Sequence, residues 1–186
     1  MSRIIWFLLL IILPLNSLKS QIISHWGEDS SYYLYQSIDE NLIPHKITFN
    51  QNLSKKEVLD SIANYLTVKF FVMSNKYYKD KRKIVVTVQK VTLIEVHNQI
   101  FYIASININD PDKVCMTTFF QGSTGAYNTY LTLVSNFIQP QLVTPLLDGI
   151  VFTYNDEELK PMDHINLEGL ISEREIDNLV RRMLKN

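Results

Sequence analysis

Apolar side chains recur mostly at alternate positions in two neighbouring stretches, Lys83–Val96 and Ile100–Ile108. Between them lies the turn-like segment His97-Asn98-Gln99. Alternation of this kind is typical of β-strands that bury one face, and one slip in each run indicates a bulge or a bend. The pattern therefore predicts a central hairpin on which the rest of the chain packs.

Helical spacing is clearest after residue 54. Ser54-Lys55-Lys56-Glu57 has the form of a capping box, and apolar residues follow it at intervals of three and four. This predicts a helix that ends between Leu66 and Asn75. Because Thr67–Met73 is rich in β-branched and aromatic residues, a strand over that stretch stays an open alternative.

Two further helices are predicted in the second half of the chain. Gly122-Ser123-Thr124-Gly125 opens the first, which begins near Ser123 with an N-cap and ends before Pro140. The second begins at another capping box, Ser172-Glu173-Arg174-Glu175, and its apolar stripe makes residues 172–185 an amphipathic C-terminal helix.

Shorter apolar runs predict the remaining strands at Lys46–Phe49, Lys113–Gln121 and Ile150–Tyr154. Residues 21–44 show no clean period and are predicted to be an irregular lead-in. The fold class is thus predicted to be α/β of the α+β type. A single domain over residues 45–186 would have a mixed or antiparallel sheet, flanking helices and the amphipathic C-terminal helix.

The first twenty residues have the composition of a signal peptide. Arg3 precedes the unbroken apolar run Ile4–Leu13, and small polar residues lead to Ser20. The run is shorter than the roughly 20 residues that a spanning helix needs, although an uncleaved signal anchor is the alternative. The sequence predicts a secreted or periplasmic protein with no stable membrane span after removal of the leader.

Charge narrows the choice of partners. The whole chain has a formal charge of −1, and removal of the leader with Arg3 and Lys19 brings it to −3. Nucleic-acid binding requires an excess of clustered Lys and Arg, so we expect no nucleic-acid partner.

The sequence offers few candidates for catalytic or metal-binding residues. Cys115 is the single cysteine, so no intramolecular disulfide can form, and its apolar neighbours predict a buried strand residue. The four histidines lie far apart, and the oxygen-rich turn around Pro111 lacks the register of a calcium loop, so an Asx-Pro turn is expected. The glycines around Ser123 fit neither a nucleophile elbow nor a phosphate-binding loop. We therefore assign no catalytic, cofactor-binding or metal-binding residue.

The order of elements over residues 47–160 resembles the sporulation and spore-germination domain family known as GerMN. The resemblance rests on the strand Ile103–Ile108, a glycine-bearing loop, the helix around Tyr130–Phe137 and a strand with a glycine turn. In the usual pattern the last strand precedes its glycine, whereas here Asp148-Gly149 comes before Ile150–Tyr154. The resemblance implies a small α/β module of the bacterial envelope, used in assembly or regulation, without catalytic residues.

The predicted function is an exported, non-enzymatic interaction or assembly module that binds an envelope protein. The alternatives are an exported enzyme, such as a hydrolase with an active site not evident from sequence, and a carrier of a small apolar ligand. Tyrosines with neighbouring basic residues suit partner binding, because tyrosine offers rigid contact area while basic groups steer association. The candidate partner-binding residues are Tyr77, Tyr78, Lys79, Lys81, Arg82, Tyr32, Tyr33 and Tyr35. A solvated basic loop is the simpler interpretation of residues 76–83.

Overall fold

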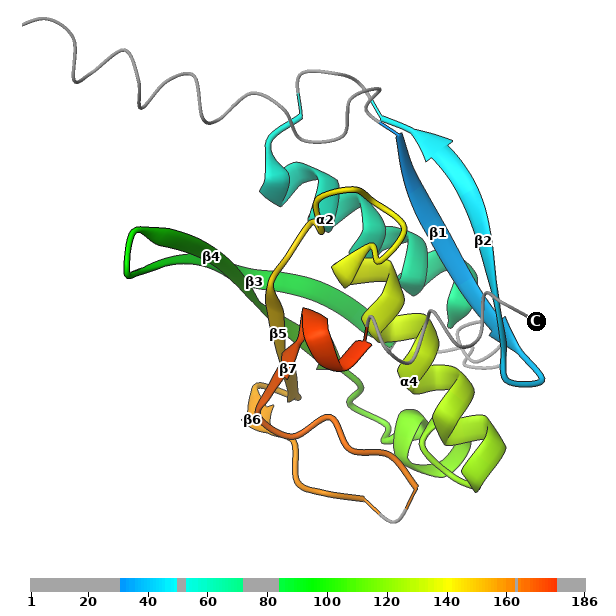
Figure 1. The fold of residues 1–186 in the computed structure, drawn as a ribbon. Coiled ribbons are helices and arrows are strands. Elements are labelled where there is room, and N and C mark those ends of the chain that lie inside the picture. Colours follow the sequence, from blue (N-terminus) through cyan, green and yellow to red (C-terminus); the bar gives the residue numbers. More distant parts are fainter. Residues whose placement is uncertain (1–30, 50–52, 72–83, 163, 177–186) are drawn as a thin grey trace, which may run out of the picture.

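The computed structural model describes residues 31–49, 53–71, 84–162 and 164–176. It has two sheets and two long helices (Figure 1). In chain order the elements are β1 Ser31–Ile38, β2 Asn41–Thr48, α2 Lys55–Tyr65, the π-helix η1 Leu66–Phe70, β3 Val85–Val96, β4 Gln99–Asn109, the π-helix η2 Cys115–Phe119, α4 Ser123–Ile138, β5 Gly149–Tyr154, β6 Glu157–Glu158 and β7 Leu170–Ser172.

The larger sheet is built around the predicted hairpin. β3 and β4 pair antiparallel, with a register shift between Val88 and Lys90 that makes Gln89 the extra residue of a bulge. His97 and Asn98 form the turn with φ of 49° and 62°, a conformation that matches the right-handed twist of paired strands. β4 pairs parallel with β5, and β6 and β7 pair antiparallel with β5. The sheet is therefore mixed, which is one of the two predicted arrangements.

The predicted capping box starts α2. The Ser54 amide donates to Glu57 Oε2 at 2.7 Å, and the Glu57 amide donates to Ser54 Oγ at 3.3 Å, so both orphan amides are satisfied. The chain continues from Leu66 to Phe70 as a π-helix and not as a strand. The helical alternative for this stretch is confirmed up to Phe70, and residues 72–75 lie outside the described residues.

The prediction of a strand over Lys113–Gln121 is wrong. Residues 115–119 form a π-helix that leads into α4, because the Asp110 carboxylate accepts the Cys115 amide at 2.6 Å and bends the chain after β4. Cys115 is buried there as predicted, but in a helix. α4 begins at Ser123, and its N-cap is Gly122 at φ 71° with no side-chain cap. Together η2 and α4 form the crossover that parallel pairing of β4 and β5 requires.

The prediction of an irregular segment over 21–44 is wrong from residue 31 onward. β1 and β2 form a complete antiparallel hairpin, with Ser31 opposite Thr48 and Ile38 opposite Asn41. Pro44 lies inside β2, an edge strand of this two-stranded sheet, where a missing amide hydrogen costs little. The three tyrosines lie in β1 and do not alternate with polar residues, and α4 contacts this strand.

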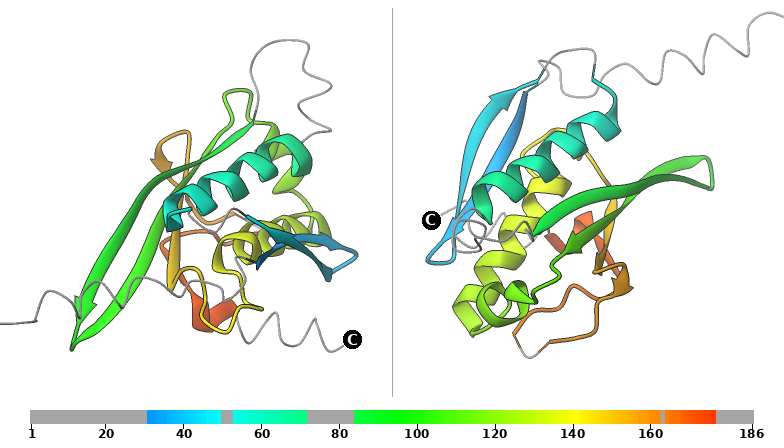
Figure 2. Two further views of the ribbon diagram at one scale, coloured as in Figure 1. Left: turned by 90° about the horizontal axis from the view of Figure 1, so that it is seen from above. Right: turned by 180° about the vertical axis from the view of Figure 1, so that it is seen from behind.

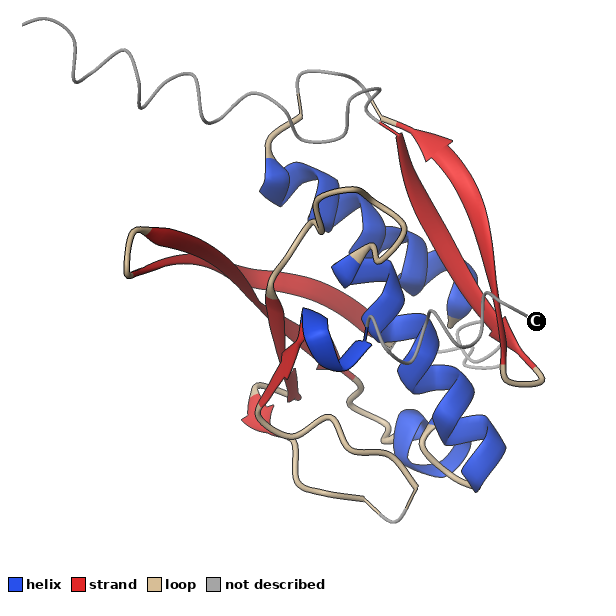
Figure 3. Cartoon of the chain, viewed as in Figure 1, coloured by secondary structure: helices blue, strands red, loops and turns tan. Residues whose placement is uncertain are grey.

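The elements form three layers in a single domain. The helices α2 and α4 lie between the β1–β2 hairpin and the five-stranded sheet, as the colours of Figure 3 and the two views of Figure 2 show. One hydrophobic core joins the three layers and contains fully buried large side chains from each, among them Tyr35, Leu59, Ile106, Phe137 and Phe152.

The predicted C-terminal helix is described only at its first turn. The amide and Oγ of Ser172 both donate to Glu175 Oε2, at 2.9 and 3.0 Å, and residues 173–176 are helical. Residues 177–185 of that prediction lie outside the described residues.

Candidate functional site

The outer half of the β3–β4 hairpin extends away from the helices (Figures 1 and 2). We call residues 91–101 the arm. β5 pairs with β4 only from Ile103 onward, so no described strand pairs with either edge of the arm. The arm has the apolar composition of a buried strand and the position of an exposed one.

Apolar side chains are exposed on both faces of the arm. The register puts Leu93 opposite Tyr102 and Ile100 opposite Glu95, on the face that continues into the core. Ile94 and Val96 lie on the other face, so the two faces are both partly apolar. The exposed fractions are 53% for Leu93, 40% for Ile94, 45% for Val96 and 45% for Ile100.

The two ends of the arm differ in how they are held. At the inner end, Asp148 is paired with Tyr102: the Tyr102 amide donates to Asp148 Oδ2 at 2.7 Å, and the Asp148 amide donates to the Tyr102 carbonyl at 2.9 Å. On β3, the Val86 amide donates to Thr67 Oγ1 at 2.9 Å, near the far end of the hairpin from the arm. The hairpin is thus held outside the arm, and the arm itself presents unpaired strand edges.

A cation lies at the inner end of the arm. The Lys55 Nζ lies 3.9 Å from the centroid of the Tyr102 ring and donates to the Leu146 carbonyl. Burial lowers the pKa of Lys55 to about 8, against the smaller opposing effect of the Asp148 carboxylate. Lys55 therefore connects α2 to Tyr102, the residue next to the arm.

The sequence-predicted partner-binding residues are not brought together at the arm. Tyr77, Tyr78, Lys79, Lys81 and Arg82 lie outside the described residues. Tyr32 and Tyr35 are buried, and the Tyr35 hydroxyl accepts a hydrogen bond from the Gln141 amide at 3.3 Å. These two side chains are part of the core and offer no contact surface, whereas Tyr33 is half-buried.

The tyrosines are buried because α4 takes the place of a strand beside β1. Polar side chains of α4 bond the backbone of alternate β1 residues: Thr132 Oγ1 accepts the Ser37 amide at 3.1 Å. Gln139 accepts the Tyr33 amide at 2.8 Å and donates to the Tyr33 carbonyl at 2.7 Å. The sequence signal is a row of polar residues at positions 128, 132 and 136 of an otherwise apolar helix and at its C-cap, residue 139.

A second buried polar cluster surrounds Asp110. Its carboxylate accepts the Tyr154 hydroxyl at 2.7 Å as well as the Cys115 amide, and Asn155 bonds its backbone on both sides. Burial, followed by the Asp110 charge, raises the pKa of the Cys115 thiol, which opposes the thiolate that nucleophilic chemistry needs. Asp110 thus has a structural role in the turn after β4, the place where sequence predicted an Asx-Pro turn.

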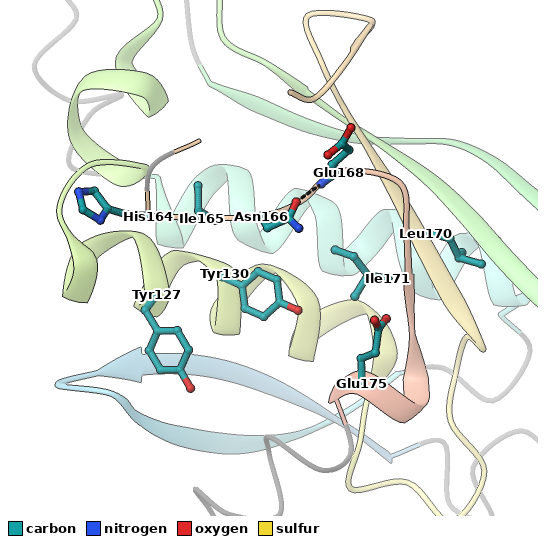
Figure 4. A pocket seen from close by; sticks show the side chains of 9 residues that line it. All are labelled: Tyr127, Tyr130, His164, Ile165, Asn166, Glu168, Leu170, Ile171 and Glu175. Atoms are coloured by element: carbon teal, nitrogen blue, oxygen red, sulfur yellow. Dashed lines mark hydrogen bonds between the residues drawn. The ribbon is translucent and has the colours of Figure 1, made fainter. Parts of the chain in front are cut away.

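An open pocket of about 290 Å³ lies between α4 and residues 164–175 (Figure 4). Tyr127 and Tyr130 line it from α4, and Glu168, Ile171 and Glu175 line it from the opposite segment. In the described part of the chain, no three His, Cys, Asp or Glu side chains gather as a metal site.

Comparisons of the chain with protein-family models, curated proteins and solved structures found no match. None of the described helices has both the length and the apolar character needed to cross a bilayer.

Proposed function

We propose that the mature chain is an exported, non-enzymatic interaction module of the bacterial cell envelope and that it binds a partner protein through the arm. The observation that carries the proposal is the exposure of Leu93, Ile94, Val96 and Ile100 on a hairpin with unpaired edges. An isolated two-stranded hairpin is only marginally stable in water, so apolar exposure of this kind favours a bound state.

The mode of binding follows from the backbone. An extended segment of a partner can add to a free strand edge through main-chain hydrogen bonds, and side chains on the two faces then supply specificity. Complete burial of each exposed apolar side chain would contribute about 1 kcal/mol from the area that is still accessible. The bonds between Tyr102 and Asp148 hold β4 next to the arm and keep the arm oriented before binding, which lowers the entropy cost.

The edges of the arm carry little charge. Natural edge strands usually carry charges that prevent pairing, and within residues 91–101 only Glu95 carries a formal charge besides the titratable His97. An edge this weakly protected is expected where pairing is the function. The resemblance to GerMN domains and the predicted signal peptide support the envelope as the place of binding.

Site-specific photocrosslinking tests the proposal. A photoreactive residue is placed at position 94 or 100, and in a control at position 143, where Val143 is fully exposed and lies outside residues 91–101. We expect one discrete crosslinked partner from the two arm positions and none from the control. The adduct from position 100 should disappear when Leu93, Ile94 and Val96 are changed to Thr, which keeps strand propensity while removing apolar area.

Two outcomes would count against the proposal: equal adducts from all three positions, or no adduct at the arm in intact cells. Export and cleavage of the leader are checked separately by the intact mass of the exported protein. A mass that corresponds to a chain starting at Gln21 supports the predicted leader, and a membrane-bound form that retains Met1 supports the anchor alternative.

A further inference from the structure

The pocket between α4 and residues 164–175 has a chemical character that differs from that of the arm. Tyr130 contributes a half-buried ring, and in Figure 4 its hydroxyl and the Glu175 carboxylate both point into the space between the two segments. Ile171 forms a buried apolar wall. The pocket shares no residue with the arm.

Two carboxylates, those of Glu168 and Glu175, line the described part of the pocket. None of the nine described residues that line it is Lys or Arg. The Glu175 charge is felt inside the pocket: after burial, it is the next largest cause that raises the pKa of Tyr130, to about 12. Tyr130 therefore keeps its hydroxyl proton at physiological pH and presents a neutral ring beside a carboxylate.

Glu175 is held in place by Ser172. The amide and hydroxyl of Ser172 both donate to its Oε2, so the carboxylate is oriented before any ligand arrives. On the opposite side, Asn166 Oδ1 accepts the Glu168 amide at 3.0 Å, which shapes the segment that carries the second carboxylate. Such preorganisation reduces what binding costs in side-chain entropy.

We propose that this pocket binds the positively charged side chain, Lys or Arg, of a peptide segment. A cation beside a tyrosine ring and a carboxylate gains both cation–π and ion-pair attraction. The volume of about 290 Å³ is at the lower limit of small-molecule sites and suits one long side chain. The methylene stem of that side chain would lie against Ile171, with the charged group between Tyr130 and Glu175.

Titration of the full mature chain by amide-resolved NMR tests this. The probes are the N-acetyl, N′-methylamide derivatives of lysine and arginine, with the norleucine derivative as the neutral isostere. We expect the two cationic probes to shift the amides of residues 130 and 175, and the norleucine probe to leave them in place. n-Butylammonium chloride, a free amine without a peptide backbone, should bind at least about threefold more weakly than the lysine derivative.

Matched variants separate charge from structure. Glu175→Gln removes the charge but can still accept from Ser172, because Gln also completes a capping box. It should weaken the lysine derivative about fivefold, as should Tyr130→Leu, whereas Tyr130→Phe should keep most of the binding. Glu157→Gln in β6 is the control and should change nothing.

The proposal is overturned if the norleucine derivative binds as well as the lysine derivative, or if Glu175→Gln leaves the affinity unchanged. Equal binding of n-butylammonium would overturn the peptide source and leave a free amine as the ligand. Thermal unfolding of each variant confirms folding, and Glu168→Gln, at an exposed position, provides a second charge-removing test if Glu175→Gln does not fold.

Discussion

The side-chain amide of Asn136 pairs with the backbone of Tyr35 as a neighbouring strand would. Asn136 Nδ2 donates to the Tyr35 carbonyl at 2.7 Å, and the Tyr35 amide donates to Asn136 Oδ1 at 3.1 Å. Both residues are fully buried. One helix side chain thus satisfies two backbone groups on the edge of β1 that would otherwise face a dry interior.

Asn136→Ala is predicted to destabilise the protein by about 3 kcal/mol, because two buried backbone groups lose their partner and each costs about 1–3 kcal/mol when unsatisfied. The free energy of unfolding from urea titration measures this. Asn64→Ala, at an exposed position on α2, is the control and should lie within about 0.5 kcal/mol of the unchanged protein. Equal effects of the two substitutions would refute the role of Asn136.

Tyr154→Phe should lower the free energy of unfolding by about 1–2 kcal/mol, since it removes a hydroxyl that donates to the buried Asp110 carboxylate. The substitution keeps the ring and therefore its contacts with Phe120. Tyr65→Phe, which removes a hydroxyl from a half-buried ring on α2, serves as the comparison and should have a smaller effect. An unchanged free energy of unfolding for Tyr154→Phe would mean that the Asp110 carboxylate does not need this donor.

The Cys115 thiol is predicted to be inert in the folded protein. Burial and the Asp110 charge raise its pKa, so thiolate is scarce at pH 8 and the sulfur is out of reach of solvent. Reaction with an aromatic disulfide reagent should be slow in buffer and complete within minutes in 6 M guanidinium. Rapid labelling of the folded chain would show that residues 115–119 open readily.

The stability of the protein should depend on Lys55 between pH 8 and 9. The pKa of Lys55 is about 8 when folded and near 10.5 when unfolded, so in this window the unfolded chain binds more protons. Stability relative to a Lys55→Met variant should therefore rise with pH, by up to about 1 kcal/mol per pH unit, and less where solvent screens the charge.

The comparison with Lys55→Met matters because other groups act in the opposite direction. The pKa values of Tyr35 and Cys115 are raised by burial, so their contributions fall as pH rises above the unfolded values of 10.0 and 9.0. These contributions are common to both proteins and cancel in the difference. A difference that stays flat from pH 8 to 9 would contradict a lowered pKa for Lys55.

The elements that depend on local signals were predictable from sequence. The capping boxes predicted at Ser54 and Ser172 rest on hydrogen bonds between residues three apart. The box at Ser54 is complete, and at Ser172 the amide donates to the Glu175 carboxylate. The β3–β4 hairpin and its bulge near Gln89 followed from alternation and its slip, which are properties of a strand and its immediate neighbour.

The elements that only the tertiary structure determined depend on contacts between residues that are distant in the sequence. Residues 31–38 form a strand because α4, about a hundred positions later, bonds their backbone, and residues 115–119 form a helix because Asp110 and Tyr154 hold the turn before them. Apolar alternation predicted that the whole central hairpin is buried on one face. In the structure, burial ends near Ala104, where β5 and the helices no longer cover the sheet. Apolar alternation specifies a strand, but which part of that strand is covered depends on the rest of the fold, and so the arm could be recognised only in three dimensions.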